Sequence, residues 1–287
     1  MKLIALDLDG TTLNSSKEIN QENVKMIKRA QASGNIVVIL SGRSKDSIEK
    51  ELAKVDINCP IGANNGTSIY VENKLIKQIS LPRRQNKKII FLLDQENLPY
   101  KVTTNKGSFA PANWSKRFND FIESAKVPKS HFENEHFSAL TQSPEKLGQK
   151  VFENPDEILT DKEIMVQKYF VIALNPEQKE KIQNDLKKIT GLKVLSSTPF
   201  SFDVSNINGH KGTALKVFAE HFNIPLEHTI AVGDEGNDIP MLDAAGLGVA
   251  VENADNELKK FSDFITLSND ENGVAHVIDK YVLNKKL

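Results

Sequence analysis

The sequence predicts an α/β protein built on a doubly wound parallel sheet with a second α/β domain inserted into it. Short apolar runs alternate with amphipathic helical patterns, and the helices are expected at 21–33 and 44–55. The runs that read as strands are 3–8, 35–40, 59–63, 228–233 and 247–251. Such alternation is typical of parallel sheets with helices on both faces.

The chain changes character at Pro82-Arg83-Arg84, after a predicted hairpin over Ser68–Ile79 that turns at Asn73-Lys74. From there to about Asn206 the chain supplies elements of its own, with no clear pattern from 107 to 144. The expected helices are 84–96 and 177–189, and the expected strands are 100–104, 169–174, 192–196 and 200–204. We therefore expect a core domain of residues 1–82 and 207–287 and an inserted domain of residues 83–206.

Two carboxylates follow the first predicted strand, because Asp7 and Asp9 stand two residues apart directly before Gly10. Residues i and i+2 point to one side of a strand, and ligands of open α/β sheets bind at the carboxyl ends of strands. Repulsion between the two is relieved by a divalent cation such as Mg²⁺, or by a raised pKa that leaves one protonated. Asp7 is then suited to attack phosphorus and Asp9 to protonate a leaving alcohol, whereas a simple Asp-Gly turn is the alternative.

Three later loops carry groups that suit a phosphate. Ser41-Gly42 joins an apolar run to a helical stretch, where a hydroxyl and free N–H groups form an anion site. Lys211 begins another helical stretch, and lysine is a compact charge suited to phosphate. Gly233–Asp238 is a second acidic loop after a strand. Singly, Ser41 reads as a helix cap and Lys211 as a solvated lysine, but the four loops together favour phosphate chemistry.

These segments together resemble the haloacid dehalogenase superfamily of Mg²⁺-dependent phosphohydrolases. The run Gly233–Leu242, followed by Ala245–Val251, and the long insert between Ser41 and Lys211 are similar to the Cof-type subfamily. That subfamily consists of small-molecule phosphatases with a type IIB cap. The resemblance covers nearly the whole chain and implies a Rossmann-like catalytic core with a cap that determines substrate specificity.

The resemblance also implies a role for each motif residue. Asp7 corresponds to the nucleophile, Asp9 to the general acid and base whose backbone carbonyl also reaches the metal, and Asp234 to the remaining metal carboxylate. Asp238 resembles a residue that positions the metal site or Lys211. The implied phosphate ligands are the Leu8 N–H, the Ser41 hydroxyl, the Gly42 amide, Lys211 and Asn237.

Departures from the family pattern occur at Thr12, His210 and 251–254, and none of them removes a catalytic group. We expect His210 to be a partly exposed neighbour of a helix cap rather than a substrate contact. We expect Cys59, the single cysteine, to lie in an apolar strand as a core residue rather than a nucleophile.

The expected function is hydrolysis of a small phosphorylated metabolite, with a sugar phosphate as the first choice. Phosphorylated cofactors such as pyridoxal phosphate and flavin mononucleotide are the alternative substrates. A phosphotransferase similar to the phosphomannomutases would use the same residues with a different acceptor, and a non-catalytic binding module would lack one of them. The sequence determines neither the substrate nor the subunit number.

The insert returns to the core almost directly at Lys211, so cap movement is a hypothesis for opening and closing the site. Aromatic residues in such an insert pack in the cap core more often than they contact a ligand. The cap residues considered for substrate contact are Trp114, His131, His136, Phe137 and Lys168.

Composition fits this interpretation. The 287 residues are 39% hydrophobic, and 37 basic against 38 acidic residues give a net charge of −1. That balance gives no reason to expect nucleic acid or an anionic membrane as partner. No targeting segment is visible and no apolar run reaches the roughly 18 residues of a membrane span, so we expect a cytoplasmic enzyme.

Overall fold

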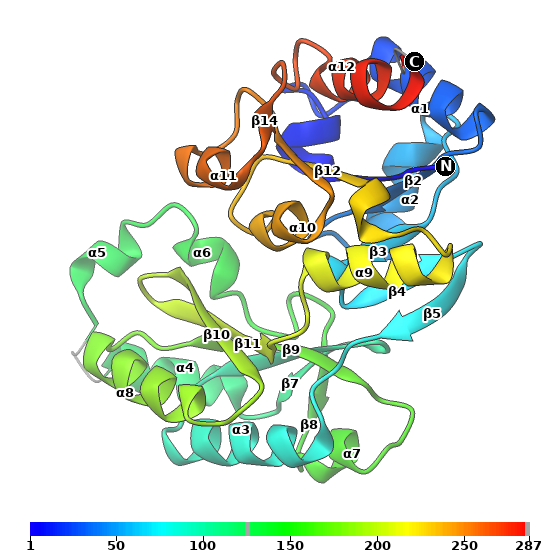
Figure 1. The fold of residues 1–287 in the computed structure, drawn as a ribbon. Helices are drawn as coiled ribbons and strands as arrows, with labels where there is room; N and C mark the ends of the chain where they lie inside the picture. Colours follow the sequence, from blue (N-terminus) through cyan, green and yellow to red (C-terminus); the bar gives the residue numbers. More distant parts are fainter. Residues whose placement is uncertain (124–126, 285–287) are drawn as a thin grey trace. The chain divides into compact units, whose positions relative to one another are not determined.

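The computed structural model describes residues 1–123 and 127–284, which form two structural units (Figure 1). The first unit comprises Met1–Gln78 and Gly209–Leu287, and the second comprises Ile79–Asn208. Each unit contains its own sheet. In the described part of the chain, no helix is both long and apolar enough to cross a bilayer.

The sheet of the first unit has eight strands in the order β14-β13-β12-β1-β2-β3-β4-β5. Neighbouring strands from β14 to β3 are parallel, and β3, β4 and β5 are antiparallel. The predicted doubly wound parallel sheet is therefore confirmed. The strands are β1 (Leu3–Leu6), β2 (Ile36–Leu40), β3 (Ile61–Ala63), β4 (Ser68–Val71), β5 (Lys74–Gln78), β12 (Thr229–Gly233), β13 (Leu247–Ala250) and β14 (Phe264–Ile265).

Strand β1 lies at the centre of this sheet, and all four of its side chains are fully buried. A parallel strand covered by helices on both faces reads as a continuous apolar run, as β1 does. The predicted hairpin forms from β4 and β5, but it turns at Glu72-Asn73 rather than one residue later. Both turn residues have positive φ, at +48° and +63°, a conformation that the tight turns of hairpins require.

Helices cover both faces of this sheet. In Figure 1, α1 and α12 lie on the opposite side of β12 from α9 and α10, and each of these two pairs is in contact. The helices of the unit are α1 (Gln21–Ala32), α2 (Lys45–Ala53), α9 (Lys211–His221), α10 (Ile239–Ala244), α11 (Asn256–Phe261) and α12 (Gly273–Ile278).

The second unit holds a mixed six-stranded sheet in the order β10-β11-β9-β6-β7-β8, in which only β7 and β8 pair in parallel among the described strands. Its strands are β6 (Tyr100–Thr104), β7 (Gly107–Pro111), β8 (Lys150–Phe152), β9 (Val166–Ile172), β10 (Leu192–Thr198) and β11 (Ser201–Asn206). Its helices are α3 (Arg83–Gln95), α4 (Trp114–Glu123), α5 (Lys129–Phe132), α6 (Phe137–Leu140), α7 (Asp156–Leu159) and α8 (Pro176–Lys187).

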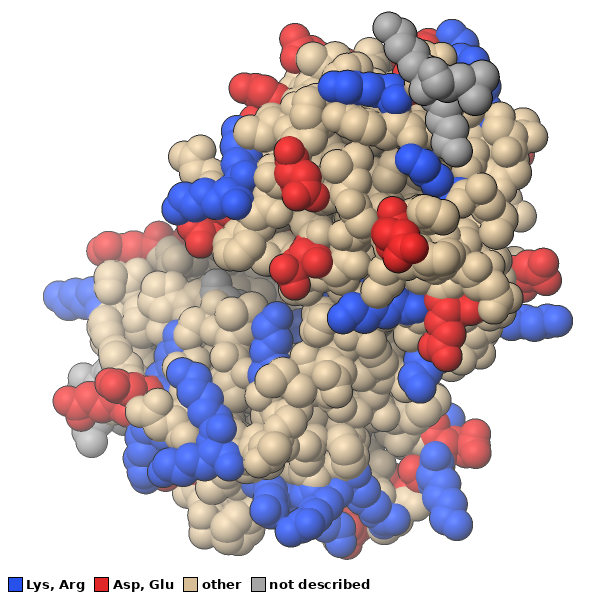
Figure 2. Space-filling view, viewed as in Figure 1, with Lys and Arg blue, Asp and Glu red and all other residues tan. Residues whose placement is uncertain are grey.

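Side chains of β9 alternate between two hydrophobic clusters, as the period of a strand requires. Tyr169 and Val171 belong to the cluster that includes residues of α3 and α8, whereas Phe170 and Ile172 pack with residues of α4 and α6. The outer face of α3 is basic, and Figure 2 shows the Lys and Arg side chains that gather over it. Arg83, Arg84, Lys87 and Lys88 are exposed there, opposite the buried Ile89, Ile90 and Leu93, so α3 is an ordinary amphipathic helix.

Candidate active site

Polar residues from five segments of the first unit converge at the carboxyl ends of its central strands. Asp7 follows β1, Ser41–Arg43 follows β2, Asn64–Gly66 follows β3, and Asp234–Asp238 follows β12. Lys211 is the first residue of α9. Parallel strands place their carboxyl ends at one edge of the sheet, so Asp7 and Asp238, 231 residues apart in the sequence, become neighbours there.

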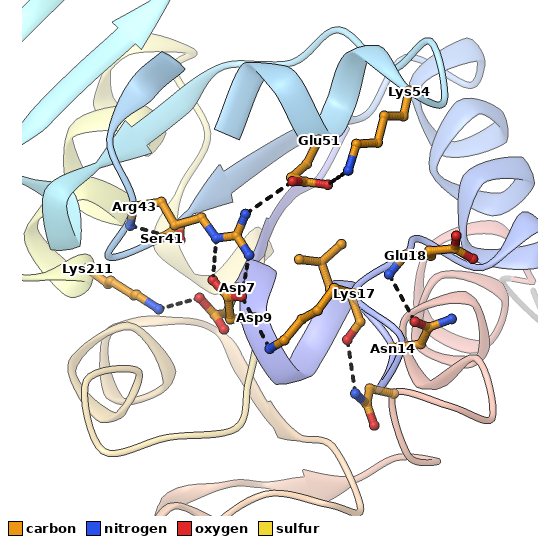
Figure 3. A network of polar contacts seen from close by, with 12 residues as sticks. Asp7, Asp9, Asn14, Lys17, Glu18, Ser41, Arg43, Glu51, Lys54 and Lys211 are labelled. Carbon is orange, nitrogen blue, oxygen red and sulfur yellow. Dashed lines mark hydrogen bonds and ion pairs between the residues drawn. The ribbon is translucent and has the colours of Figure 1, made fainter. Parts of the chain in front are cut away.

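Lys211 is fully buried between two carboxylates. Its Nζ lies 2.5 Å from Asp7 Oδ1 and 2.5 Å from Asp238 Oδ1 (Figure 3 shows the contact with Asp7). Burial alone would lower the pKa of Lys211, but the two carboxylates together raise it above its ordinary value. The ammonium therefore stays charged.

Asp7 and Asp234 have raised pKa values for a related reason. Burial and the neighbouring charge of Asp238 raise the pKa of Asp7 well above its ordinary value, although Lys211 partly offsets the shift. Burial raises the pKa of Asp234 to about 6, against the hydrogen bond that Thr11 Oγ1 donates to Asp234 Oδ1 at 2.7 Å. The single ammonium of Lys211 does not balance the three carboxyl groups of Asp7, Asp234 and Asp238. The site therefore favours additional positive charge.

The acidic cluster has the donor chemistry of a metal centre. Oxygens of Asp7, Asp234 and Asp238 all lie within 4.8 Å of one another. Carboxylate oxygens are the ligands that hard divalent cations prefer, and a bound cation would offset the burial and repulsion that raise the pKa values of Asp7 and Asp234. The cluster therefore fits a metal site formed by residues that follow β1 and β12.

Asp238 is already engaged on both of its oxygens. Oδ1 faces Lys211, and Oδ2 accepts hydrogen bonds from the backbone N–H groups of Asp234 and Glu235 at 3.0 and 3.1 Å. The fully buried side chain thus holds the acidic loop in shape and fixes the ammonium. Of the three carboxylates, Asp7 and Asp234 are the better placed to give oxygens to a cation.

Gly10 permits a close approach between the first loop and this cluster. Its φ is +75°, and a Cβ at this position would lie 2.2 Å from Asp234 Oδ2. Both the backbone conformation and the contact require glycine. The loop closes with a hydrogen bond from Leu13 N to Leu8 O at 2.8 Å, and Thr12 Oγ1 donates to the backbone carbonyl of Asp7 at 2.5 Å. Thr12, one of the departures from the family pattern, thereby holds the backbone at Asp7.

Asp9 points to a different partner from Asp7. Arg43 donates to both carboxylate oxygens of Asp9, from Nε at 2.7 Å and Nη2 at 2.6 Å, and Lys17 Nζ lies 3.7 Å away (Figure 3). The hydrogen bonds and charge of Arg43 lower the pKa of Asp9. From the sequence we expect the repulsion to be relieved by a divalent cation or by a raised pKa that leaves Asp9 partly protonated. The raised pKa values belong instead to Asp7 and Asp234, and that of Asp9 is lowered. The Asp9 carboxylate also lies outside the acidic cluster.

The structure adds Asn65, which the sequence interpretation missed. Its Oδ1 accepts a hydrogen bond from Asn237 Nδ2 at 3.1 Å, and its N–H donates to the carbonyl of Ser41 at 2.9 Å. Ser41 itself is buried, and its Oγ accepts from Arg43 N at 3.2 Å. The sequence could have indicated this segment, because Asn64-Asn65-Gly66 follows β3 and so lies at the same edge of the sheet as the other loops.

His210 and Cys59 were both expected to take no direct part in the chemistry. His210 is the N-cap residue of α9, with Nδ1 accepting from Thr213 N at 3.2 Å, so it is the cap rather than a neighbour of the cap. Cys59 precedes β3 instead of lying within it, because the strand begins only at Ile61. Burial raises the pKa of Cys59 to about 12, which keeps the thiol protonated and excludes a nucleophilic role near neutral pH.

The five cap residues mostly have partners within the second unit. Trp114 and Phe137 pack in the same hydrophobic cluster, which also contains Phe200. His131 is buried with its ring 5.6 Å from that of Phe200, and Lys168 Nζ lies 3.2 Å from Asp203 Oδ1. His136 is exposed beside Glu135. The expectation that aromatic residues of the insert form cap core therefore holds for Trp114 and Phe137.

Comparison with known proteins agrees with this arrangement. Residues 4–278 match the haloacid dehalogenase-like hydrolase family. The chain is 34% identical to Phosphatase YwpJ of Bacillus subtilis, over 97% of this chain and 99% of that one. It is 32% identical to the 5-amino-6-(5-phospho-D-ribitylamino)uracil phosphatase YwtE of the same organism, over 98% of each.

Solved structures share the fold. A haloacid dehalogenase-like hydrolase from B. subtilis superimposes with a TM-score of 0.71 at 32% identity, covering 98% of this chain and 100% of that one. A sugar phosphatase of haloacid dehalogenase subclass IIB superimposes with a TM-score of 0.68, covering 97% of this chain and 98% of that one, at 21% identity. The chain therefore belongs to the haloacid dehalogenase-like hydrolases, among their Cof-type phosphatases with a subclass IIB cap.

Proposed function

We propose that this enzyme is a Mg²⁺-dependent phosphatase that hydrolyses the phosphate ester of a small polyhydroxylated metabolite, with a sugar phosphate as the first candidate. The observation that carries the proposal is the buried ammonium of Lys211, 2.5 Å from both Asp7 and Asp238 and beside Asp234. Phosphoryl transfer through an aspartyl-phosphate requires a nucleophilic carboxylate, a fixed positive charge and carboxylates that can bind a divalent cation.

In the first half of the reaction, an Oδ atom of Asp7 attacks phosphorus and the bond from phosphorus to the ester oxygen breaks. The leaving alkoxide takes a proton from Asp9. In the second half, Asp9 takes a proton from water, the resulting hydroxide attacks phosphorus, and the bond to Asp7 breaks. Inorganic phosphate leaves, Asp7 is again a carboxylate, and Asp9 is again the protonated acid with which the cycle began.

The proposed phosphate ligands act on the charge of the transferring group. Lys211 supplies a permanent positive charge, and the Ser41 hydroxyl, the N–H groups of Leu8 and Gly42, and Asn237 supply oriented dipoles. Asp7 and Asp234 would hold Mg²⁺, together with the backbone carbonyl of Asp9. The ion supplies positive charge that stabilises the ionised carboxylates and the phosphoryl oxygens.

Asp9 must change partners during this cycle. Its ion pair with Arg43 lowers its pKa, which keeps Asp9 ionised but makes it a weaker proton acceptor. Donation to the leaving group requires a protonated Asp9, so before this step Asp9 leaves Arg43 and takes a proton from solvent, which it returns to solvent when the ion pair forms again. We propose that Arg43 holds Asp9 in the resting enzyme.

We further propose that the unit Ile79–Asn208 is the specificity domain and that the rest of the chain is the catalytic domain. The substrate class draws support from the relative YwtE, whose name specifies a phosphorylated ribityl compound. That relative makes a phosphorylated ribityl compound the second candidate substrate. Both candidates are phosphate esters of a chain rich in hydroxyl groups.

The experiment that tests the proposal is phosphate release from a panel of sugar phosphates, ribityl phosphates and phosphorylated cofactors with Mg²⁺. An Asp7→Ala variant is the control, because it removes the proposed nucleophile. Release that the control abolishes supports the proposal and ranks the substrates. Equal release by both proteins, or none by the wild type, contradicts it. A phosphotransferase would release phosphate slowly until a sugar acceptor is added, so the same panel is repeated with acceptors.

A further inference from the structure

The turn after β3 contains the most unusual backbone near the active site. Asn64, Asn65 and Gly66 have φ values of +51°, +58° and +84°, so three consecutive residues are left-handed. Left-handed conformations are costly for residues other than glycine and persist only where the surroundings impose them. Strain of this kind concentrates at functional sites, and the contacts of the turn show what it holds in place.

The turn contacts the segments proposed to bind phosphate. Asn65 N–H donates to the carbonyl of Ser41 at 2.9 Å, and Asn64 N–H donates to the carbonyl of Arg43 at 2.9 Å. Gly66 faces the start of α9, since a Cβ there would lie 2.9 Å from the His210 carbonyl oxygen. The turn therefore spaces the Ser41 loop from the helix that begins with Lys211.

The side chain of Asn65 reaches the third segment. Asn65 Oδ1 accepts the hydrogen bond from Asn237 Nδ2 at 3.1 Å. The same Oδ1 lies 3.3 Å from the position of a Cβ on Gly42, so Asn65 lies against that amide segment as well. Both asparagines are exposed, so their hydrogen bond contributes little to stability and its main consequence is the position of the Asn237 amide.

We infer that Asn65 is a positioning residue for the phosphate site, which holds the Asn237 amide and the Ser41-Gly42 segment at the spacing that a phosphoryl group requires. The inference rests on the proposed function, in which Ser41, Gly42 and Asn237 bind phosphate. Asn65 acts through these groups and is not assigned a contact with substrate.

The variant that tests this role is Asn65→Gly. Glycine adopts positive φ readily, so the change removes the amide without opposing the backbone. Asn73→Gly is the matched control, because Asn73 is exposed in the β4–β5 turn with a φ of +63°. We expect Asn65→Gly to lower kcat/KM by about five-fold and to weaken binding of inorganic phosphate with Mg²⁺ by the same factor, with an unchanged Tm. Asn73→Gly should match the wild type in all three measurements.

A double-mutant cycle distinguishes positioning from a general structural effect. Asn237→Ala should lower phosphate affinity in the wild type but have little further effect in Asn65→Gly, because Asn237 has already lost its support. In Asn65→Asp, which retains an acceptor oxygen and tolerates positive φ, Asn237→Ala should still lower the affinity. The inference would be overturned if Asn237→Ala lowered phosphate affinity by the same factor in Asn65→Gly as in the wild type. It would also be overturned if Asn65→Gly bound phosphate as tightly as the wild type.

Calorimetry with inorganic phosphate keeps the two proposals separate. A wild type that releases no phosphate from any substrate contradicts the proposed function, whereas the comparison of phosphate dissociation constants still decides the role of Asn65.

Discussion

Arg43 donates hydrogen bonds to both carboxylate oxygens of Asp9, from Nε at 2.7 Å and from Nη2 at 2.6 Å. The two residues are far apart in sequence, one after β1 and the other after β2, and the planar guanidinium matches the carboxylate on both oxygens. The pair keeps Asp9 ionised and separates its electrostatics from those of Asp7, whose pKa is raised. Two carboxylates two positions apart in sequence thus have opposite pKa shifts.

Replacing Arg43 with methionine should move the pH profile of kcat/KM to higher pH by about one unit. Loss of the guanidinium raises the pKa of Asp9, because an adjacent opposite charge typically shifts a carboxyl by one unit or more. Lys17→Met is the control, since Lys17 lies 3.7 Å from Asp9 and is largely exposed. An equal shift in both variants, or none in Arg43→Met, would show that Arg43 does not control Asp9.

Replacing Lys211 with alanine should abolish measurable turnover and destabilise the fold by about 3–5 kcal/mol, the usual effect of leaving buried charges unpaired. Without Lys211, which partly offsets the raised pKa of Asp7, that pKa lies further above its unfolded value, so the stabilising proton uptake of Asp7 is lost as pH rises. Urea denaturation in EDTA should therefore show a larger loss at pH 8 than at pH 6. Lys216→Ala, an exposed change on α9, should show neither effect; a pH-independent loss for Lys211→Ala would contradict the pairing.

Mg²⁺ should raise the Tm of the wild type, because a ligand that binds only the folded state stabilises it. EDTA should silence turnover and added Mg²⁺ should restore it. The shift in Tm should vanish in Asp234→Asn and persist in Glu235→Gln, a change in the exposed neighbour. It should also weaken below about pH 6, where Asp234 takes up a proton that competes with the cation. A full shift in Asp234→Asn would remove Asp234 from the metal site.

Gly10→Ala and Gly34→Ala form a matched pair at almost the same φ, +75° and +77°. Both changes place alanine at positive φ, which destabilises the folded state by about 1 kcal/mol. A Cβ at Gly10 also meets Asp234, whereas no heavy atom lies within 4 Å of one at Gly34. Titration of the Tm with Mg²⁺ should therefore show at least ten-fold weaker binding for Gly10→Ala alone. Equal metal affinity in the two variants would count against the close packing of Gly10 on Asp234.

In the second unit, Lys101→Met should stabilise the protein at pH 7 by removing a buried charge. Burial lowers the pKa of Lys101 from 10.5 to about 8. Between these values the unfolded chain holds the proton that the folded chain has lost, so the free energy of unfolding of the wild type rises with pH. The Tm advantage of the variant should shrink from pH 7 to pH 10. Lys87→Met on the exposed face of α3 should show a constant difference, and a constant difference for Lys101→Met would refute the shift.

The parallel strands were predictable because burial on both faces leaves continuous apolar runs, as in β1 and β12. In the segment from 107 to 144, α5 and α6 have four residues each and are too short to show a helical period. The strand β7 and the ten-residue α4 in the same segment were missed. The acidic residues of the site follow strands and were found from that position. The sequence did not predict the Arg43–Asp9 pair, because the pair depends on side-chain direction in a loop where Asp9 and Gly10 depart from helical geometry.

Both ends of the inserted unit, Ile79 and Asn208, fall outside the segments that carry the acidic cluster. Asp7, Lys211, Asp234 and Asp238 all belong to the discontinuous unit that the insert interrupts. With Ile79–Asn208 as the proposed specificity domain, the choice of substrate can change while all four of these residues, and the proposed cleavage of the ester, stay as they are. A single chemistry can in this way serve many metabolites as the insert diverges.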